Sequence, residues 1–99
     1  LEYNKSVAGE RYRAVGKAMG VKNIDEMNDA AAADATIAAV KQLSVDVGIP
    51  ANLAQLNKVD PADFAALAEL ALHDTCMSTN QITPTRDEVV AVYTAAFRG

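Results

Sequence analysis

The chain lacks most of the side chains from which catalytic and metal centres are built. It is 99 residues long and contains one cysteine, one histidine, three prolines and no tryptophan. A lone cysteine cannot close an internal disulfide, so a reducing compartment is the default. No apolar run approaches the roughly 20 residues that span a bilayer, and no secretory signal is recognisable. We therefore expect a cytoplasmic protein that does not bind a membrane.

Positive charge is also scarce. The chain carries nine basic and 13 acidic residues, which gives a net charge of −4. Nucleic-acid binding needs a basic face that neutralises phosphates, and a helix lying on a membrane surface needs a basic polar face. The charge balance therefore argues against both functions.

Glycine is too sparse and scattered to form a phosphate-binding loop. The five glycines stand at positions 9, 16, 20, 48 and 99, and none follows a predicted strand, as a dinucleotide-binding turn requires. The one histidine has no second histidine with which to share a metal. The sequence thus predicts no catalytic, cofactor-binding or metal-binding residue within this chain.

Alanine, by contrast, makes up about a fifth of the residues. It is the strongest helix former, and its small side chain lets helices approach closely. With 51% hydrophobic residues and this length, the composition predicts a single all-α domain over residues 1–99.

Hydrophobic periodicity predicts the first two helices. The first runs from Gly9 to Met19 and ends at Gly20. Its predicted apolar face consists of Ala8, Tyr12, Val15 and Met19. The second begins at Asn28 or Asp29 and ends at Val47, before Gly48 and Pro50. Its predicted apolar stripe consists of Ala33, Ile37, Val40, Leu43 and Val47.

Capping residues mark the two later helices. A short turn is expected from Asn52 to Leu56, with Asn57 in the left-handed conformation. The third helix starts at Asp60 and Pro61, and it ends near Leu72 or His73. The fourth starts at Thr85, where Thr85 and Glu88 have the spacing of a capping box, and continues to the end of the chain.

The candidates for a chemical role are His73, Cys76 and Arg86. Glu69 lies four residues before His73, so the two can pair across one helical turn. A nucleophilic cysteine needs a base, and a helix end followed by a loop does not assure contact between His73 and Cys76. A position lining a cleft is the better interpretation of Cys76. Arg86, in the first turn of the fourth helix, could attract an anion, although an ordinary solvated helix start also explains it.

Two motifs stand in a fixed order along the chain. Val47-Gly48-Ile49-Pro50 ends the second helix, and Asp74-x-Cys76-x-x-Thr79-Asn80 follows the third, with Thr85 and Glu88 after it. In this order and spacing, nearly the whole chain resembles the C-terminal helical portion of the iron-containing (group III) alcohol dehydrogenases. One departure is that family members usually continue the loop as Asn-Pro, whereas Gln81 and Ile82 follow Asn80 here.

The resemblance implies a fold and a parent enzyme. The fold is a four-helix-plus bundle, the C-terminal helical part of a dehydroquinate synthase-like fold. The parent enzyme transfers a hydride between a primary alcohol and NAD(P), and a divalent metal, usually Fe²⁺, acts as Lewis acid. The one Asp and three His that hold this metal in the family lie upstream of the matching segment. The resemblance also implies that Cys76, Met77, Ser78 and Asn80 line the substrate cleft.

The chain is then expected to be an inactive fragment. Its partners would be the missing N-terminal domain of the same polypeptide and a small alcohol or aldehyde, in a homo-oligomer. The alternative is a free-standing helical module that binds a protein partner, because alanine-rich faces suit both. A carrier of acyl groups ranks last, since no Asp-Ser-Leu attachment site occurs.

Overall fold

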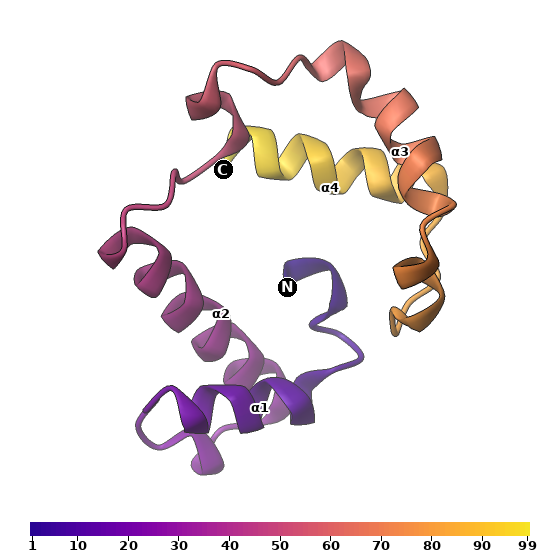
Figure 1. The fold of residues 1–99 in the computed structure, drawn as a ribbon. Helices are drawn as coiled ribbons and strands as arrows, with labels where there is room; N and C mark the ends of the chain where they lie inside the picture. Colours follow the sequence, from indigo (N-terminus) through magenta and orange to yellow (C-terminus); the bar gives the residue numbers. More distant parts are fainter. The chain divides into compact units, whose positions relative to one another are not determined.

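The computed structural model describes all 99 residues and contains four α-helices and no strand (Figure 1). The helices are α1 (Gly9–Ala18), α2 (Asp29–Asp46), α3 (Phe64–Leu72) and α4 (Arg86–Arg98). Five short 3-10 turns join them: η1 (Glu2–Asn4), η2 (Ile24–Glu26), η3 (Leu53–Leu56), η4 (Pro61–Asp63) and η5 (Thr75–Thr79). The all-helical class is confirmed. None of the helices combines the length and apolarity that a membrane span requires.

Contacts within the chain gather into two compact units, Leu1–Ile49 and Pro50–Gly99. The boundary falls at the proline that the sequence places after the second helix. Each unit contains one pair of packed helices. That residues 1–99 act as a single domain stays a prediction.

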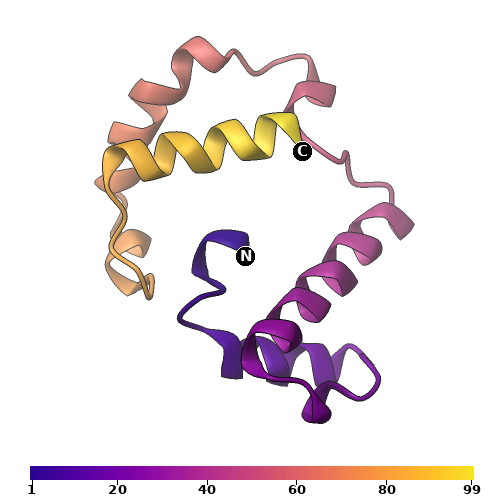
Figure 2. The ribbon, with the colours of Figure 1, turned by 180° about the vertical axis from the view of Figure 1, so that it is seen from behind.

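In the first unit, α1 packs against the first half of α2 (Figures 1 and 2). Gly16 of α1 is buried at this contact, and its lack of a side chain leaves room for Thr36 of α2 and Ile24 of η2. The Thr36 hydroxyl lies 2.8 Å from the carbonyl oxygen of Tyr12 and 2.9 Å from that of Ala32. This buried polar group is therefore satisfied. The buried apolar side chains of the unit are Ala8, Ile24, Ala32, Ala33 and Ile37.

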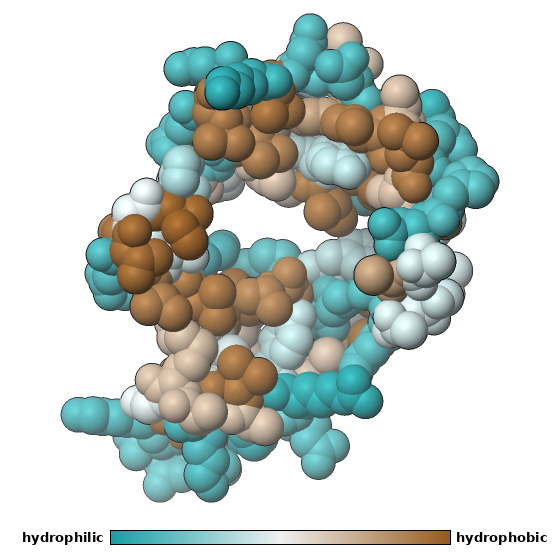
Figure 3. Space-filling view, viewed as in Figure 1, coloured by the Kyte–Doolittle hydropathy of each residue, from teal (hydrophilic) through white to brown (hydrophobic).

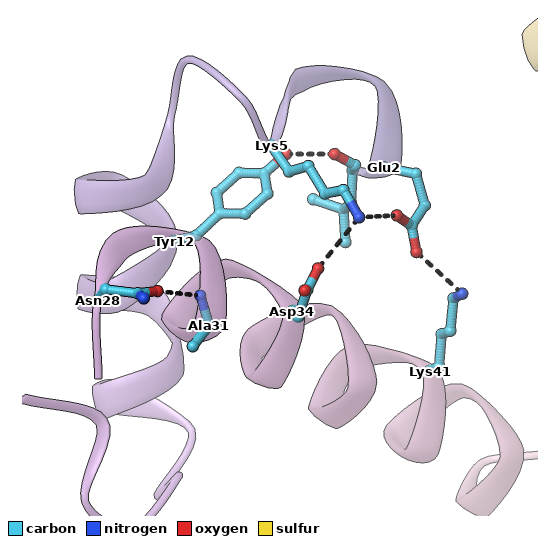
Figure 4. Close-up of polar contacts among 8 residues, drawn as sticks. Glu2, Lys5, Tyr12, Asn28, Ala31, Asp34 and Lys41 are labelled. Carbon is cyan, nitrogen blue, oxygen red and sulfur yellow. Dashed lines mark hydrogen bonds and ion pairs between the residues drawn. The ribbon is translucent and has the colours of Figure 1, made fainter. Parts of the chain in front are cut away.

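Ion pairs tie the segment before α1 to α2 (Figure 4). The Glu2 carboxylate lies 3.1 Å from Lys41 Nζ and 3.2 Å from Lys5 Nζ. Lys5 also lies 3.1 Å from the Asp34 carboxylate. All four side chains are largely exposed, so the network fixes where the segment lies more than it adds to stability.

In the second unit, α3 packs against α4 around one aromatic cluster. Phe64 is buried, stacks on Tyr93 with ring centroids 5.6 Å apart, and meets Phe97 edge to face at 5.9 Å. The third helix was predicted from Asp60 and Pro61, but η4 precedes the α-helical part. Such 3-10 turns are common at helix starts.

The predicted helix ends are present. Asn28, Asp60 and Thr85 each accept a hydrogen bond from a backbone N–H two or three residues ahead. Asn57 adopts the left-handed conformation with φ of 54°, and Gly48 follows α2 with φ of 81°. These positions are governed by local chemistry, which the sequence specifies directly.

The predicted apolar faces are only partly buried. Val15 of α1 and Met19, just after its end, are exposed because α1 meets α2 through Gly16 instead. In α2, burial is confined to the first half, since α1 has 10 residues and α2 has 18. The exposed large side chains at the far end are Leu43, Val45, Val47 and Ile49, and Figure 3 shows hydrophobic side chains over this end of α2.

Candidate functional site

The segment between α3 and α4 forms a compact turn held by its own side chains. Asp74 begins η5, and its Oδ1 accepts a hydrogen bond from the Cys76 N–H at 2.8 Å. The Ser78 hydroxyl donates to the Thr75 carbonyl oxygen at 2.8 Å, and the Thr79 hydroxyl lies 3.0 Å from the Cys76 carbonyl oxygen. Polar side chains thus satisfy the backbone locally, as in other Asx and Ser/Thr turns.

Asn80 closes the turn. Its Nδ2 donates to the Ile82 carbonyl oxygen at 2.6 Å. This bond spans Gln81. A side-chain hydrogen bond therefore restrains the backbone where the sequence lacks the fixed φ of proline.

A pocket of about 600 Å³ opens beside this turn. Most of its lining is apolar. It is lined by Leu67, Leu70 and Ala71 of α3, by Asp74, Cys76, Met77 and Asn80 of the turn, and by Tyr93 of α4. Cys76 is an exposed free thiol, whereas Met77 and Asn80 are half-buried. The site is open to solvent and mostly apolar, with few polar groups.

The structure brings three of the four predicted cleft residues to this pocket. Cys76, Met77 and Asn80 line it, while Ser78 does not and instead bonds the Thr75 backbone. That these residues line a substrate cleft stays a prediction.

The sequence alone did not indicate the helical side of the pocket. Leu67, Leu70, Ala71 and Asp74 recur at the spacing of one helix face, which could have signalled a shared wall. Three of them, Leu67, Leu70 and Ala71, are apolar and suit a packed core equally well, so the pattern did not separate a pocket wall from a packed face.

The Glu69–His73 side-chain pair that the spacing allows does not form. His73 Nδ1 instead lies 2.7 Å from the Glu69 backbone carbonyl oxygen. The Glu69 carboxylate lies 2.7 Å from Arg86 Nε, at the start of α4. Arg86 is thus partnered within the chain, because α3 and α4 pack side by side and bring opposite charges together.

The residues present do not fit a metal centre. No group of three or more His, Cys, Asp and Glu side chains lies close enough to hold a metal ion. His73 and Cys76 are not joined by a hydrogen bond: the imidazole meets a backbone carbonyl, and the Cys76 N–H meets Asp74. This chain therefore supplies no base paired with its thiol.

Comparison with known proteins decides the family. Residues 1–97 match the Fe-containing alcohol dehydrogenase family, C-terminal. The chain belongs to this family. Its relatives include the lactaldehyde reductase of Escherichia coli K12, with 37% identity over 97 residues, which covers 98% of this chain and 25% of that enzyme. The 1,3-propanediol dehydrogenase of Klebsiella pneumoniae is 36% identical over 95 residues, covering 96% of this chain and 24% of that enzyme.

Solved structures give the same result for the fold. A crystal structure of 1,3-propanediol oxidoreductase matches 97% of this chain with a TM-score of 0.90 and 34% identity. An alcohol dehydrogenase from Oenococcus oeni matches 97% with a TM-score of 0.89 and 35% identity. The predicted fold, the C-terminal helical part of an iron alcohol dehydrogenase, is confirmed. The chain spans about a quarter of the length of these relatives.

Proposed function

We propose that this chain is the C-terminal helical part of a cytoplasmic, metal-dependent NAD(P) alcohol dehydrogenase that interconverts primary alcohols and aldehydes. The observation that supports this most is the family match over residues 1–97 together with the pocket beside the Asp74–Asn80 turn. The relatives that carry this segment are about four times longer. We place the metal and nucleotide sites in the remainder of such a polypeptide, since the residues here do not form a metal centre.

In this proposal the chain contributes one wall of the substrate cleft. The lining offers the apolar surfaces of Leu67, Leu70 and Met77 to a short carbon chain. The polar groups of the lining at the turn are the Asp74 carboxylate, the Asn80 amide and the Cys76 thiol. Burying the carbon chain of the substrate against such a wall excludes water and orients the reacting end.

The proposal is tested with the chain alone and with a chimera. In the chimera, this chain replaces the matching quarter of the E. coli lactaldehyde reductase. With NAD(H), Fe²⁺ and lactaldehyde, we expect no turnover by the 99-residue chain and turnover by the chimera. Turnover by the isolated chain, or a folded chimera that binds nucleotide and metal but never reacts, would overturn the proposal.

The cleft wall is tested in the same chimera. Met77→Ala removes apolar contact from the pocket, so we expect KM to rise by roughly tenfold while kcat changes less. Val15→Ala is the matched control, because Val15 lies exposed in α1 outside the pocket. Equal KM values for the two variants would show that Met77 does not meet the substrate.

A further inference from the structure

One residue of α3 touches both ends of the segment that carries the pocket turn. The Glu69 carboxylate lies 2.7 Å from Arg86 Nε, the first residue of α4. The Glu69 backbone carbonyl oxygen lies 2.7 Å from Nδ1 of His73, at the end of α3. Asp74 and Asn80 bound the turn between these two contacts.

The aromatic contacts between α3 and α4 lie farther along the helices. Phe64, which stacks on Tyr93 and meets Phe97 edge to face, joins the start of α3 to the later turns of α4. The two helices therefore run in opposite directions, and the Glu69–Arg86 pair joins them at the end where the turn connects them. Within the turn, hydrogen bonds are local, between residues two or three positions apart.

We propose that the Glu69–Arg86 ion pair positions the Asp74–Asn80 turn and so sets the shape of the pocket wall. Glu69 and Arg86 are positioning residues, because neither is among the residues that line the pocket. They fix the separation between α3, from which the turn starts, and α4, which follows the turn after residues 81–85. The link to substrate rests on the proposed function, whereas the link to the turn does not.

The size of the effect follows from exposure. The side chains of Arg86 and Glu69 are 47% and 53% exposed, and ion pairs of this kind have small energies. Loss of the pair should therefore open the turn roughly two- to fivefold more often and leave the helices folded. Salt screens exposed charges, so the effect should shrink at high ionic strength.

The experiment measures amide hydrogen exchange in the 99-residue chain. The reporters are the N–H groups of Cys76, Met77 and Asn80, which bond Asp74 Oδ1, the Asp74 carbonyl and the Met77 carbonyl. Glu69→Ala keeps the backbone carbonyl that meets His73 and removes only the carboxylate. We expect these amides to exchange roughly two- to fivefold faster in Glu69→Ala and in Arg86→Ala, with little change for amides in α1 and α2.

Two controls separate positioning from general destabilisation. Asp25→Asn disrupts the comparably exposed Lys17–Asp25 pair, 2.8 Å apart in the first unit, and should leave the turn unchanged. The double variant Glu69→Arg with Arg86→Glu should restore slow exchange. In 0.5 M salt, wild-type exchange should approach that of Glu69→Ala. The proposal would be overturned if the turn amides exchanged at the wild-type rate in Glu69→Ala, or if Asp25→Asn accelerated their exchange equally.

The lactaldehyde reductase chimera separates this inference from the proposed function. Glu69→Ala there should raise KM two- to fivefold with kcat nearly unchanged. Turnover with an unchanged KM would contradict the positioning role alone. Absence of turnover whatever residue stands at position 69 would contradict the proposed function, while the exchange result would still decide the positioning role.

Discussion

At the scale of the residue, Gly16 has the strongest constraint in the first unit. A Cβ atom at this position would collide with Thr36 Oγ1 and Ile24 Cδ1. The absence of a side chain lets α1 approach α2 closely enough for the Thr36 hydroxyl to meet the Tyr12 carbonyl oxygen. Val15, its neighbour in the chain, is 48% exposed, although its spacing predicted a place in the core.

Replacing Gly16 therefore tests the helix contact. Gly16→Ala should lower the free energy of unfolding by about 1–3 kcal/mol because of overpacking, although alanine is intrinsically favoured in helices. Urea titration measures this loss. Val15→Ala in the same helix should change the unfolding free energy by less than about 0.5 kcal/mol. If Val15→Ala lost more unfolding free energy than Gly16→Ala, the apolar face predicted from periodicity would be the buried one.

At the scale of the element, single polar side chains determine where helices begin. The Thr85 hydroxyl accepts the Glu88 N–H at 3.2 Å, which caps α4. Thr85→Ala should cost about 1 kcal/mol of unfolding free energy, while Thr85→Ser, which keeps the hydroxyl, should cost much less. Thermal unfolding followed by circular dichroism gives both values. Equal losses would mean that the methyl group, not the cap, matters.

The N-terminal segment gives a pH-dependent prediction at the same scale. Hydrogen bonds from Lys41 and then Lys5 lower the pKa of the Glu2 carboxyl from its ordinary value of 4.5. A lowered carboxyl pKa stabilises the docked segment above about pH 4.5, and this contribution is lost as the pH falls through the folded-state pKa. For Lys5 the sign reverses. Asp34 and Glu2 raise its pKa, so that contribution holds below pH 10.5 and is lost as the pH rises through the folded-state pKa.

The titration of Glu2 can be followed directly by NMR of its side-chain carboxyl. In Lys41→Gln the pKa of Glu2 should move up towards 4.5, because the first of its partners is gone. High salt should shift it in the same direction in the wild type. A Glu2 pKa that is indifferent to both changes would show that the segment is not docked as the ion pairs indicate.

At the scale of the whole molecule, apolar side chains are divided between a small core and an open surface. Leu43 is 52% exposed in α2, whereas Ile37 in the same helix is 3% exposed. Leu43→Ser should therefore change the unfolding free energy of the chain by less than about 0.5 kcal/mol. Ile37→Ser should cost about 2–4 kcal/mol, through lost burial and an added hydroxyl in the core. Comparable losses, measured by urea titration, would place Leu43 in a core.

The sequence by itself determined two kinds of feature: those that depend on a few neighbouring residues, and those that depend on the whole chain taken together. The caps Asn28, Asp60 and Thr85, the left-handed Asn57 and the break at Gly48 each depend on a side chain and the few residues beside it. The helical class came from composition summed over the chain, and the family resemblance came from the order of its motifs. None of these needed knowledge of which helices touch.

Only the tertiary structure decided which residues from different elements contact each other. Periodicity assigned Val15 to the core, but the close approach permitted by Gly16 turned a different face of α1 towards α2. Spacing allowed Glu69 to pair with His73, but because α3 packs on α4, the Glu69 carboxylate pairs with Arg86 instead. The spacing of residues within one helix determines which side chains share a face. Which of these faces is buried or paired depends on the shape and charge of the elements that pack against the helix.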